Sequence, residues 1–230
     1  MGLHYSRGEA WYSLHADDTA EKSFEGTFYS DFPDFQIVGD YGKLTPYAPE
    51  KTVVGHVGLE NGWFFPFRTD ELDFITNIFR GFDHLDPSTD RFSYYIRLRP
   101  IHPGEMQFYF RAKWDFFLLR IRLFFSFFRY LFHFKAKTDW KKEGRKFFEE
   151  KIQHELFSVE IFLVAESRTR DIAESRIKSI FQNFSVFKNY PLNSFSLSLE
   201  YPSAPTLIPS QSRKTLFLSG NELSLVFQFP

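Results

Sequence analysis

The chain has 230 residues, enough for one large domain or two small ones with a sizeable buried core. It contains no cysteine, which excludes disulfides, thiolate metal sites and thiol nucleophiles. A formal net charge of −1 excludes a whole-molecule field that would attract nucleic acid or anionic lipid, so any such attraction has to be local.

The first half of the chain predicts strands that alternate with helices. We expect strands over residues 8–15, 35–38, 53–67 and 91–100, and helices over residues 20–30 and 70–79. Pro33 and Gly81 are the expected helix ends, and Asn61-Gly62 is a hairpin signal between apolar runs. Residues 91–100 alternate in polarity, which predicts a strand with one polar, basic face. The element order β-α-β-β-α-β over residues 8–100 is that of a ferredoxin-like sandwich.

The second half predicts a βαβ core, whose element order is that of a second, incomplete copy of the first architecture. Its expected elements are a polar helix over 139–153, a strand over 156–165, a helix over 169–184, a strand over 194–201 and a closing segment over 215–229. We therefore expect a mixed α+β fold in three parts. These are a ferredoxin-like subdomain over 1–103, an amphipathic aromatic and basic segment over 104–138, and a second α+β subdomain over 139–230.

Residues 114–134 form a dense aromatic segment in a chain that holds 32 phenylalanines. The segment is long enough to cross a bilayer as a helix. Its three arginines oppose this at about 2.5–3.5 kcal/mol each, whereas each Phe, Leu or Ile favours it by only about 0.3–0.6 kcal/mol. A lone transmembrane helix is therefore disfavoured.

Five polar residues of this segment fall on one side of an α-helix, because their spacings follow the helical period, whereas Arg120 lies off that line. The five are Asp115, Arg122, Ser126, Arg129 and His133. A narrow polar stripe on a broad apolar face is typical of a helix that lies in the plane of a membrane surface. The alternatives are a helix packed over the domain's own sheet with its arginines reaching outward, and a helix that binds a protein partner. The predicted membrane or partner surface comprises Trp114, Phe117, Leu118, Arg122, Phe124, Phe125, Phe128, Arg129, Leu131 and Phe132.

The sequence carries no recognisable motif for catalysis or cofactor binding. It has no Gly-x-x-x-x-Gly-Lys-Ser/Thr loop to hold nucleotide phosphates and no serine in a nucleophile-elbow setting. Its seven histidines show no metal-ligand spacing. We therefore expect no catalytic, cofactor-binding or metal-binding residue, and no enzymatic activity of this chain.

Three stretches resemble the N-terminal region of conjugation-type ATPases, the HerA/FtsK-like and TraC-like motors of bacterial type IV secretion and DNA-transfer systems. The first is the polar helix over 140–151 with the strand over 157–165 that follows it. The second is 180–184 followed by Asn193-Ser194-Phe195, and the third runs from Glu222-Leu223 to Phe229-Pro230. Gln228 stands where the family usually has histidine, and no position matches a Walker motif.

The resemblance implies an accessory domain that docks a motor to a membrane-bound secretion channel and itself lacks the P-loop motor. The implied motor-facing residues are Glu222, Leu223, Phe227 and Phe229. The expected function is thus a non-catalytic interaction domain, peripheral to the inner face of the cell membrane on its cytoplasmic side. Its expected partners are the ATPase motor, other proteins of the complex and an anionic membrane surface.

A nucleic-acid-binding module is the alternative function. Residues 111–146 interleave aromatic side chains with a basic set that could contact phosphates. The phenylalanines are too contiguous for spaced stacking platforms, which favours the interaction domain. The basic set comprises Arg111, Lys113, Lys135, Lys137, Lys141, Lys142, Arg145 and Lys146.

Overall fold

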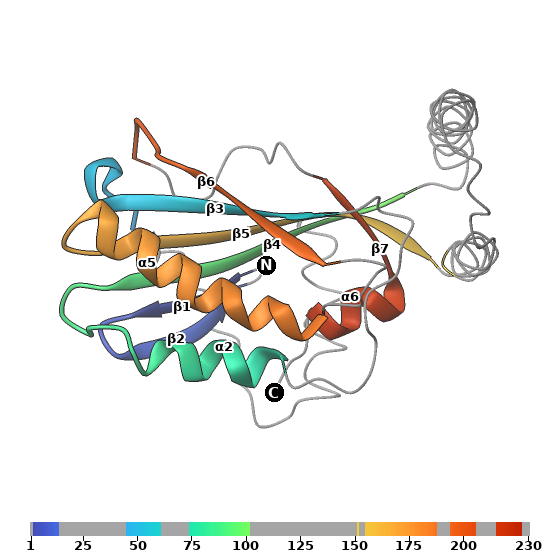
Figure 1. Ribbon diagram of the computed structural model, residues 1–230, viewed down its shortest axis with the longest axis horizontal. Coiled ribbons are helices and arrows are strands. Elements are labelled where there is room, and N and C mark those ends of the chain that lie inside the picture. The colour runs from blue at the N-terminus through green and yellow to red at the C-terminus, as the bar shows by residue number, and fades with distance from the viewer. Residues whose placement is uncertain are drawn as a thin grey trace, which may run out of the picture.

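The structure, a computed structural model, describes residues 2–13, 45–60, 74–101, 151, 155–187, 194–205 and 215–226. These residues form a mixed α+β fold in which an antiparallel sheet carries helices on one face (Figure 1). The strands are β1 (Gly2–Ser6), β2 (Glu9–Ser13), β3 (Thr52–Leu59), β4 (Arg91–Pro100), β5 (Leu156–Glu166), β6 (Phe195–Glu200) and β7 (Leu216–Ser219). The helices are α2 (Phe74–Phe82), α5 (Arg170–Phe181) and α6 (Gly220–Val226), with short 3-10 helices η2 (Pro49–Lys51) and η3 (Gln182–Phe187).

Strand β5 is the centre of the sheet. The strand order is β2-β1-β4-β5-β3-β6, and β7 also pairs with β5. Along one edge, β5 pairs with β4 from Phe157 to Glu166. Along the other edge it pairs first with β7, through residues 156–159, and then with β3, through residues 161–166. All these pairings are antiparallel. Strand β5 is therefore hydrogen-bonded to β4 along one edge and to β7 and β3 along the other.

Two strand–helix–strand units interlock around this centre. β3 and β4 run parallel to each other, with α2 between them in the chain and β5 between them in the sheet. β5 and β6 likewise run parallel, with α5 between them in the chain and β3 between them in the sheet. The strands of one unit are antiparallel to those of the other. The step from β3 to β4 and the step from β5 to β6 also cross the sheet in opposite directions. Connections of the same hand therefore place α2 and α5 on one face (Figure 1).

The predicted ferredoxin-like order within residues 8–100 is not confirmed. It would place β3 beside a strand of the first half, but both neighbours of β3, namely β5 and β6, come from the second half. β3 is buried along nearly its whole length, and the backbone groups of a buried strand need partners on both edges. The predicted subdomains 1–103 and 139–230 thus contribute strands to one sheet and share one core.

The main core lies between the sheet and the helices. The ring of Phe74, from α2, packs against the rings of Phe184 and Phe187, with centroid separations of 4.7 and 4.8 Å. Aromatic side chains of this kind explain part of the high phenylalanine content. The buried phenylalanines among the described residues are Phe74, Phe82, Phe92, Phe162, Phe184, Phe187 and Phe195.

The N-terminus forms a hairpin where the sequence predicts a single strand over residues 8–15. β1 and β2 pair from Gly2 opposite Ser13 to Ser6 opposite Glu9. The turn between them places Arg7 and Gly8 at φ values of 54° and 81°. Positive φ at both central positions matches the twist of the two strands. Arginine is an uncommon residue at the first of these positions, so the turn gave no clear signal.

Helix α2 continues through Gly81, its expected end, to Phe82. A β-carbon added to Gly81 would lie 3.2 Å from Ile180 Cγ1 of α5. Gly81 therefore marks the place where α5 approaches α2 closely, and it does not end the helix.

Other predicted elements are confirmed or differ only at their ends. β4 has the expected bounds, and β5 begins at Leu156 as expected. α5 begins after Thr169, whose Oγ1 accepts a hydrogen bond from the Ile172 N–H at 3.4 Å. The closing segment starts as strand β7 and continues as helix α6.

Several predicted elements lie outside the described residues. These are the helix over 20–30, the strand over 35–38, the Asn61-Gly62 turn, and the polar helix over 139–153 apart from Lys151.

Replacing Gly55 should weaken the packing of α5 on the sheet. A β-carbon at this position would lie 2.9 Å from Ile177 Cγ2 and 2.9 Å from Leu197 Cδ1. We expect Gly55→Ala to lower the free energy of unfolding by about 1–3 kcal/mol, because overpacking forces neighbouring side chains off their rotamers. Urea unfolding followed by circular dichroism measures the change. Gly220→Ala is the control, since nothing lies within 4 Å of its added β-carbon, and equal losses in the two variants would contradict the prediction.

The buried tyrosines should make the fold sensitive to alkaline pH. Burial raises the pKa of Tyr12 to about 12 and holds the pKa of Tyr94 well above its usual value of 10.0. In the unfolded chain these hydroxyls ionise at their usual pKa, which stabilises the unfolded state while the folded state keeps its protons. Their contribution to stability is therefore complete below about pH 10 and is lost as the pH rises toward 12.

Urea unfolding at a series of pH values between about 9 and 12 tests this sign and window. The wild-type free energy of unfolding should decline across the interval, and that of Tyr12→Phe should decline less steeply. Parallel pH profiles for the two proteins would contradict the prediction, because they would show that Tyr12 has the same pKa in the folded and the unfolded state.

Candidate interaction site

The predicted membrane or partner surface, Trp114 through Phe132, lies outside the described residues. The same holds for the basic set within 111–146 and for the motor-facing residues Phe227 and Phe229. These assignments stay predictions. The structure does describe Glu222 and Leu223, together with both ends of the chain segment that carries the aromatic residues.

This segment leaves and re-enters the sheet at one place. β4 and β5 stay paired to the point where Pro100 lies opposite Phe157. Beyond that pair, the Ile101 N–H donates to the Leu156 carbonyl oxygen at 3.1 Å. Residues 102–154, hereafter the insertion, therefore connect two adjacent strand ends, at the right of Figure 1.

Charged side chains lie near the end of β4, next to the insertion. Arg97 Nη1 donates to Glu160 Oε2 at 2.7 Å, and its guanidinium carbon lies 5.4 Å from the Phe162 ring centroid. Arg97 and Arg99 alternate with Leu98, which is 40% exposed and lies on the helix-covered side of the sheet. The base of the insertion thus combines cationic and apolar surface.

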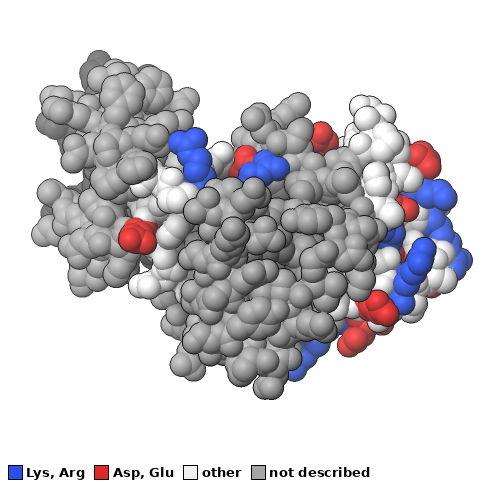
Figure 2. Space-filling model, turned by 180° about the vertical axis from the view of Figure 1, so that it is seen from behind, with Lys and Arg blue, Asp and Glu red and all other residues white. Residues whose placement is uncertain are grey.

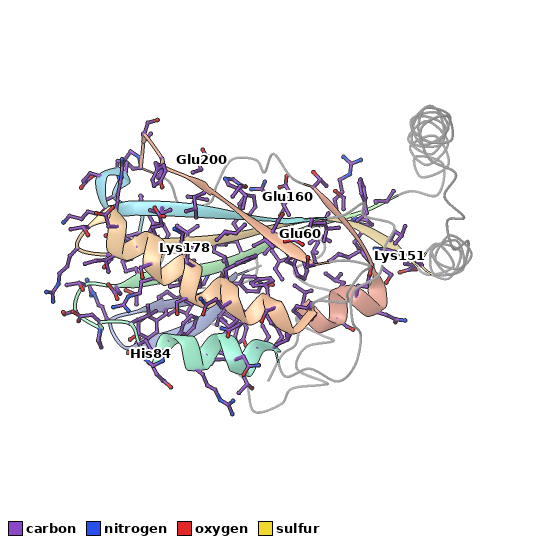
Figure 3. All side chains as sticks on the ribbon, in the orientation of Figure 1. Glu60, His84, Lys151, Glu160, Lys178 and Glu200 are labelled. Carbon is purple, nitrogen blue, oxygen red and sulfur yellow. The ribbon has the colours of Figure 1, made fainter. Side chains whose placement is uncertain are left out.

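A buried ion pair joins the end of the insertion to α6, and Figure 3 labels its lysine, Lys151. Lys151 Nζ lies 2.8 Å from Glu222 Oε2, and only 3% and 4% of the two side chains are exposed. Burial desolvates the ammonium group and lowers the pKa of Lys151, while the Glu222 carboxylate opposes that shift. Removing one partner of such a pair leaves an uncompensated buried charge and costs about 3–5 kcal/mol.

Glu222 also caps α6. Its Oε2 accepts a hydrogen bond from the Ser219 N–H at 2.9 Å, and Ser219 Oγ accepts one from the Glu222 N–H at 3.3 Å. This reciprocal arrangement is a capping box, and the sequence carries its signal as Ser219-Gly-Asn-Glu222. Glu222 is predicted from the sequence to face a motor. In the structure its carboxylate is buried, accepts a hydrogen bond from Ser219 and forms an ion pair with Lys151. Leu223 is partly buried against the core.

A second polar network is buried on the sheet face opposite the helices. His4 Nδ1 lies 2.7 Å from Ser93 Oγ, and His4 Nε2 lies 2.6 Å from Ser13 Oγ. Ser93 Oγ is also hydrogen-bonded to the Tyr47 hydroxyl. The His4 ring stacks on Trp11 at a centroid separation of 5.5 Å. Because both ring nitrogens are engaged and the ring is 1% exposed, His4 serves to position these strands.

A third network holds together the loops at the opposite end of the sheet from the insertion. The Asp90 carboxylate is 2% exposed and accepts hydrogen bonds from Ser167 Oγ at 2.5 Å, Arg176 Nε at 3.0 Å and the Asp86 N–H at 2.9 Å. Nearer the surface, hydrogen bonds from Ser88 lower the pKa of Asp86 to about 2. Figure 2 shows positive and negative side chains intermingled at this end, on the right.

No group of three or more His, Cys, Asp or Glu side chains that could hold a metal occurs in the part of the chain that the structure describes. Within that same part, no helix has both the length and the apolar character needed to cross a membrane.

The contacts Lys151–Glu222, His4–Ser93 and Asp90–Arg176 were not predicted from the sequence, because each joins residues far apart in the chain.

Ser93→Ala should destabilise the fold, because it removes the hydroxyl that satisfies both His4 and Tyr47 in a buried site. We expect the free energy of unfolding to fall by about 1–3 kcal/mol, the usual cost of leaving a buried polar group unsatisfied. Ser198→Ala is the matched control. Its hydroxyl is half-buried and makes a longer bond, 3.4 Å, to the His56 carbonyl oxygen, so we expect a change within about 0.5 kcal/mol. A Ser93→Ala protein as stable as wild type in urea would contradict the prediction.

In comparisons with known proteins, no protein-family model, no curated protein and no solved structure matches the chain.

Proposed function

We propose that this chain is a non-catalytic interaction domain that presents the insertion from one end of its sheet. The observation that carries the proposal is the pairing of β4 and β5 up to Pro100 and Phe157. This pairing holds both ends of the insertion at adjacent positions of a buried sheet. Both ends of the segment with the densest aromatic run in the chain are thus held at the same end of the sheet.

We propose further that residues 52–200 form a ferredoxin-like unit, shifted along the chain from the one expected within 8–100. Its elements are β3, α2, β4, β5, α5 and β6, in the order β-α-β-β-α-β. The strand order β4-β5-β3-β6 supports this assignment. In such a unit β4 and β5 form a hairpin, and the insertion takes the place of its turn.

The proposed role is that of an accessory domain in a bacterial type IV secretion or conjugation machine. It would dock a motor ATPase, carried elsewhere, at the cytoplasmic inner face of the cell membrane. The resemblance in sequence motivates this assignment, and the polar stripe of residues 115–133 supports a membrane surface as the docking target. Arg97 and Arg99, both exposed, add cationic surface beside the insertion.

Vesicle co-sedimentation tests the docking role. We expect the protein to sediment with vesicles of phosphatidylcholine and phosphatidylglycerol, and not with phosphatidylcholine alone. Phe124→Asp combined with Phe128→Asp should weaken this binding about tenfold or more, because it removes two large apolar groups and adds two negative charges. Circular dichroism and urea unfolding of the same variant check that its fold is kept.

Ile172→Asp combined with Tyr201→Asp is the matched control for this variant. The two side chains are 37% and 50% exposed on the body of the domain, and the substitutions add the same charge. The control should bind vesicles as the wild type does. Equal binding by the Phe124/Phe128 variant and the wild type would exclude the aromatic segment as the membrane surface.

Nucleic-acid binding is the second candidate, favoured by the exposed Arg97 and Arg99 at the base of the insertion, whose sequence carries the basic residues of 111–146. Pairing of Arg97 with Glu160 reduces the net positive charge there. Salt-sensitive retention of single-stranded DNA, without vesicle binding, would support this candidate over the first.

A further inference from the structure

Strand β6 forms an outer edge of the sheet. Among the described strands its one neighbour is β3 (Figure 1). The Glu60 N–H donates to the Ser194 carbonyl oxygen at 2.9 Å, and in an antiparallel ladder hydrogen-bonded pairs recur at every second residue. The main-chain groups of the even-numbered residues of β6 therefore point toward β3. Those of Leu197 and Leu199 point away from it, to the free edge.

This edge carries none of the features that usually protect an edge strand. Such strands are commonly blocked by lysine, proline or a bulge. β6 reads Phe-Ser-Leu-Ser-Leu-Glu, and its register with β3 is continuous. Its single charge, Glu200, has its carboxylate 2.8 Å from His56 Nε2. Within the described part of the chain, the outward main-chain groups of Leu197 and Leu199 bind to no other strand, so they can accept one.

Partly exposed apolar side chains line the same edge on the helix-covered face of the sheet. Leu197 and Leu199 pack against the main core and remain partly exposed. Tyr201, the next odd-numbered residue, is 50% exposed, and its hydroxyl donates to Glu174 Oε2 of α5 at 2.7 Å. This bond keeps the Tyr201 ring on the face that carries the two leucines. One added strand would cover all three side chains.

The edge is also complementary to itself. When two β6 strands pair antiparallel about a two-fold axis at Leu199, this residue lies opposite its own copy. Leu197 then lies opposite Tyr201 of the second copy, an apolar–aromatic pair of the kind that stabilises sheets. Ser198 lies opposite Glu200 of the second copy, so a hydroxyl meets a carboxylate and no like charges are directly opposed. In this register the outward main-chain groups of residues 197, 199 and 201 satisfy one another.

We propose that this chain forms a two-fold symmetric dimer through β6, which joins the sheets of two copies into one. A second copy is the occupant that the residues favour, because β6 matches itself at every position from Leu197 to Tyr201. The inference goes beyond the proposed function and does not depend on the insertion.

Analytical ultracentrifugation of the full chain over a series of concentrations tests the dimer. We expect wild type to dimerise reversibly, and Leu199→Lys to weaken dimerisation about tenfold or more, because it places two positive charges together at the axis. Leu199→Ile keeps an apolar side chain and should dimerise as wild type does. Urea unfolding of each variant checks that the fold is kept.

Ile172→Lys is the charge control. Ile172 is 37% exposed and lies two residues from Glu174, which places it on the other side of α5 from the β6 edge. This variant should dimerise as wild type does. A wild type that stays monomeric would overturn the dimer and leave the edge to a strand of another protein. Dimerisation unaffected by Leu199→Lys, or weakened equally by Ile172→Lys, would also overturn it.

Introduced cysteines test the register, because the chain has no cysteine of its own. In the proposed register, residue 198 and residue 200 of the second copy form a non-hydrogen-bonded pair with Cα atoms about 4.5 Å apart, which suits a disulfide. Ser198→Cys mixed with Glu200→Cys in oxidised glutathione should therefore form the mixed disulfide faster than either variant forms its own. Equal rates for the three disulfides would overturn this register.

The dimer and the membrane docking are tested separately, because sedimentation is measured without vesicles. Tyr201→Asp in the vesicle control also changes the β6 edge. Adding Leu199→Lys to the vesicle assay distinguishes loss of the dimer from loss of the membrane surface, since this variant leaves the insertion unchanged.

Discussion

The described fold depends on one strand that has to be apolar on both faces and paired on both edges. Residues 161–165 of β5 are at most 1% exposed. Their side chains alternate between the main core under the helices and a smaller cluster of Tyr47, Val54, Tyr95, Phe162 and Val164 on the other face. Because β5 lies between β3 and β4, its position also fixes where the insertion returns to the body.

Buried polar contacts lie at both ends of this sheet. At one end, Asp90 receives hydrogen bonds from three segments: the loop before β4, the loop after β5 and helix α5. At the other end, Lys151 and Glu222 connect the insertion to the start of α6. Buried ion pairs contribute little net stability compared with apolar packing, so their value is in fixing position. Among the described residues, the Asp90 end is thus held by several neutral and charged bonds, and the insertion end includes a buried ion pair and the cap of α6.

The sequence was sufficient to predict elements whose signals are local. β4 alternates polar and apolar residues, β5 is an apolar run, and Thr169 is a good cap for α5, so each was placed within a few residues. The partner of each strand was not predictable in this way, because sheet order depends on contacts between distant segments. The first half was expected to be self-contained, but β3 finds both its neighbours in the second half.

The structural roles of glycine residues and charged residues were harder to predict from the sequence than the strands and helices. Gly81 resembles a helix end in sequence, yet it permits the close approach of Ile180. The capping box of Ser219 and Glu222 has a readable spacing, but nothing in the sequence indicates that Lys151 completes it. The adjacency of residues 101 and 156 follows from the register of β4 and β5 and is invisible in the sequence. The aromatic surface itself lies in the insertion and stays a prediction from the amphipathic pattern.

The central position of β5 also sets the order in which the protein can assemble on the ribosome. β3 and β4 lack their shared neighbour until residue 166 has been translated. The aromatic run of 114–134 is translated before that point, at a stage when β3 has neither of its neighbours and β4 has only β1. A pause in translation before β5 would therefore prolong a state in which the apolar strand β3 is unpaired, and unpaired strands of this kind are prone to aggregate.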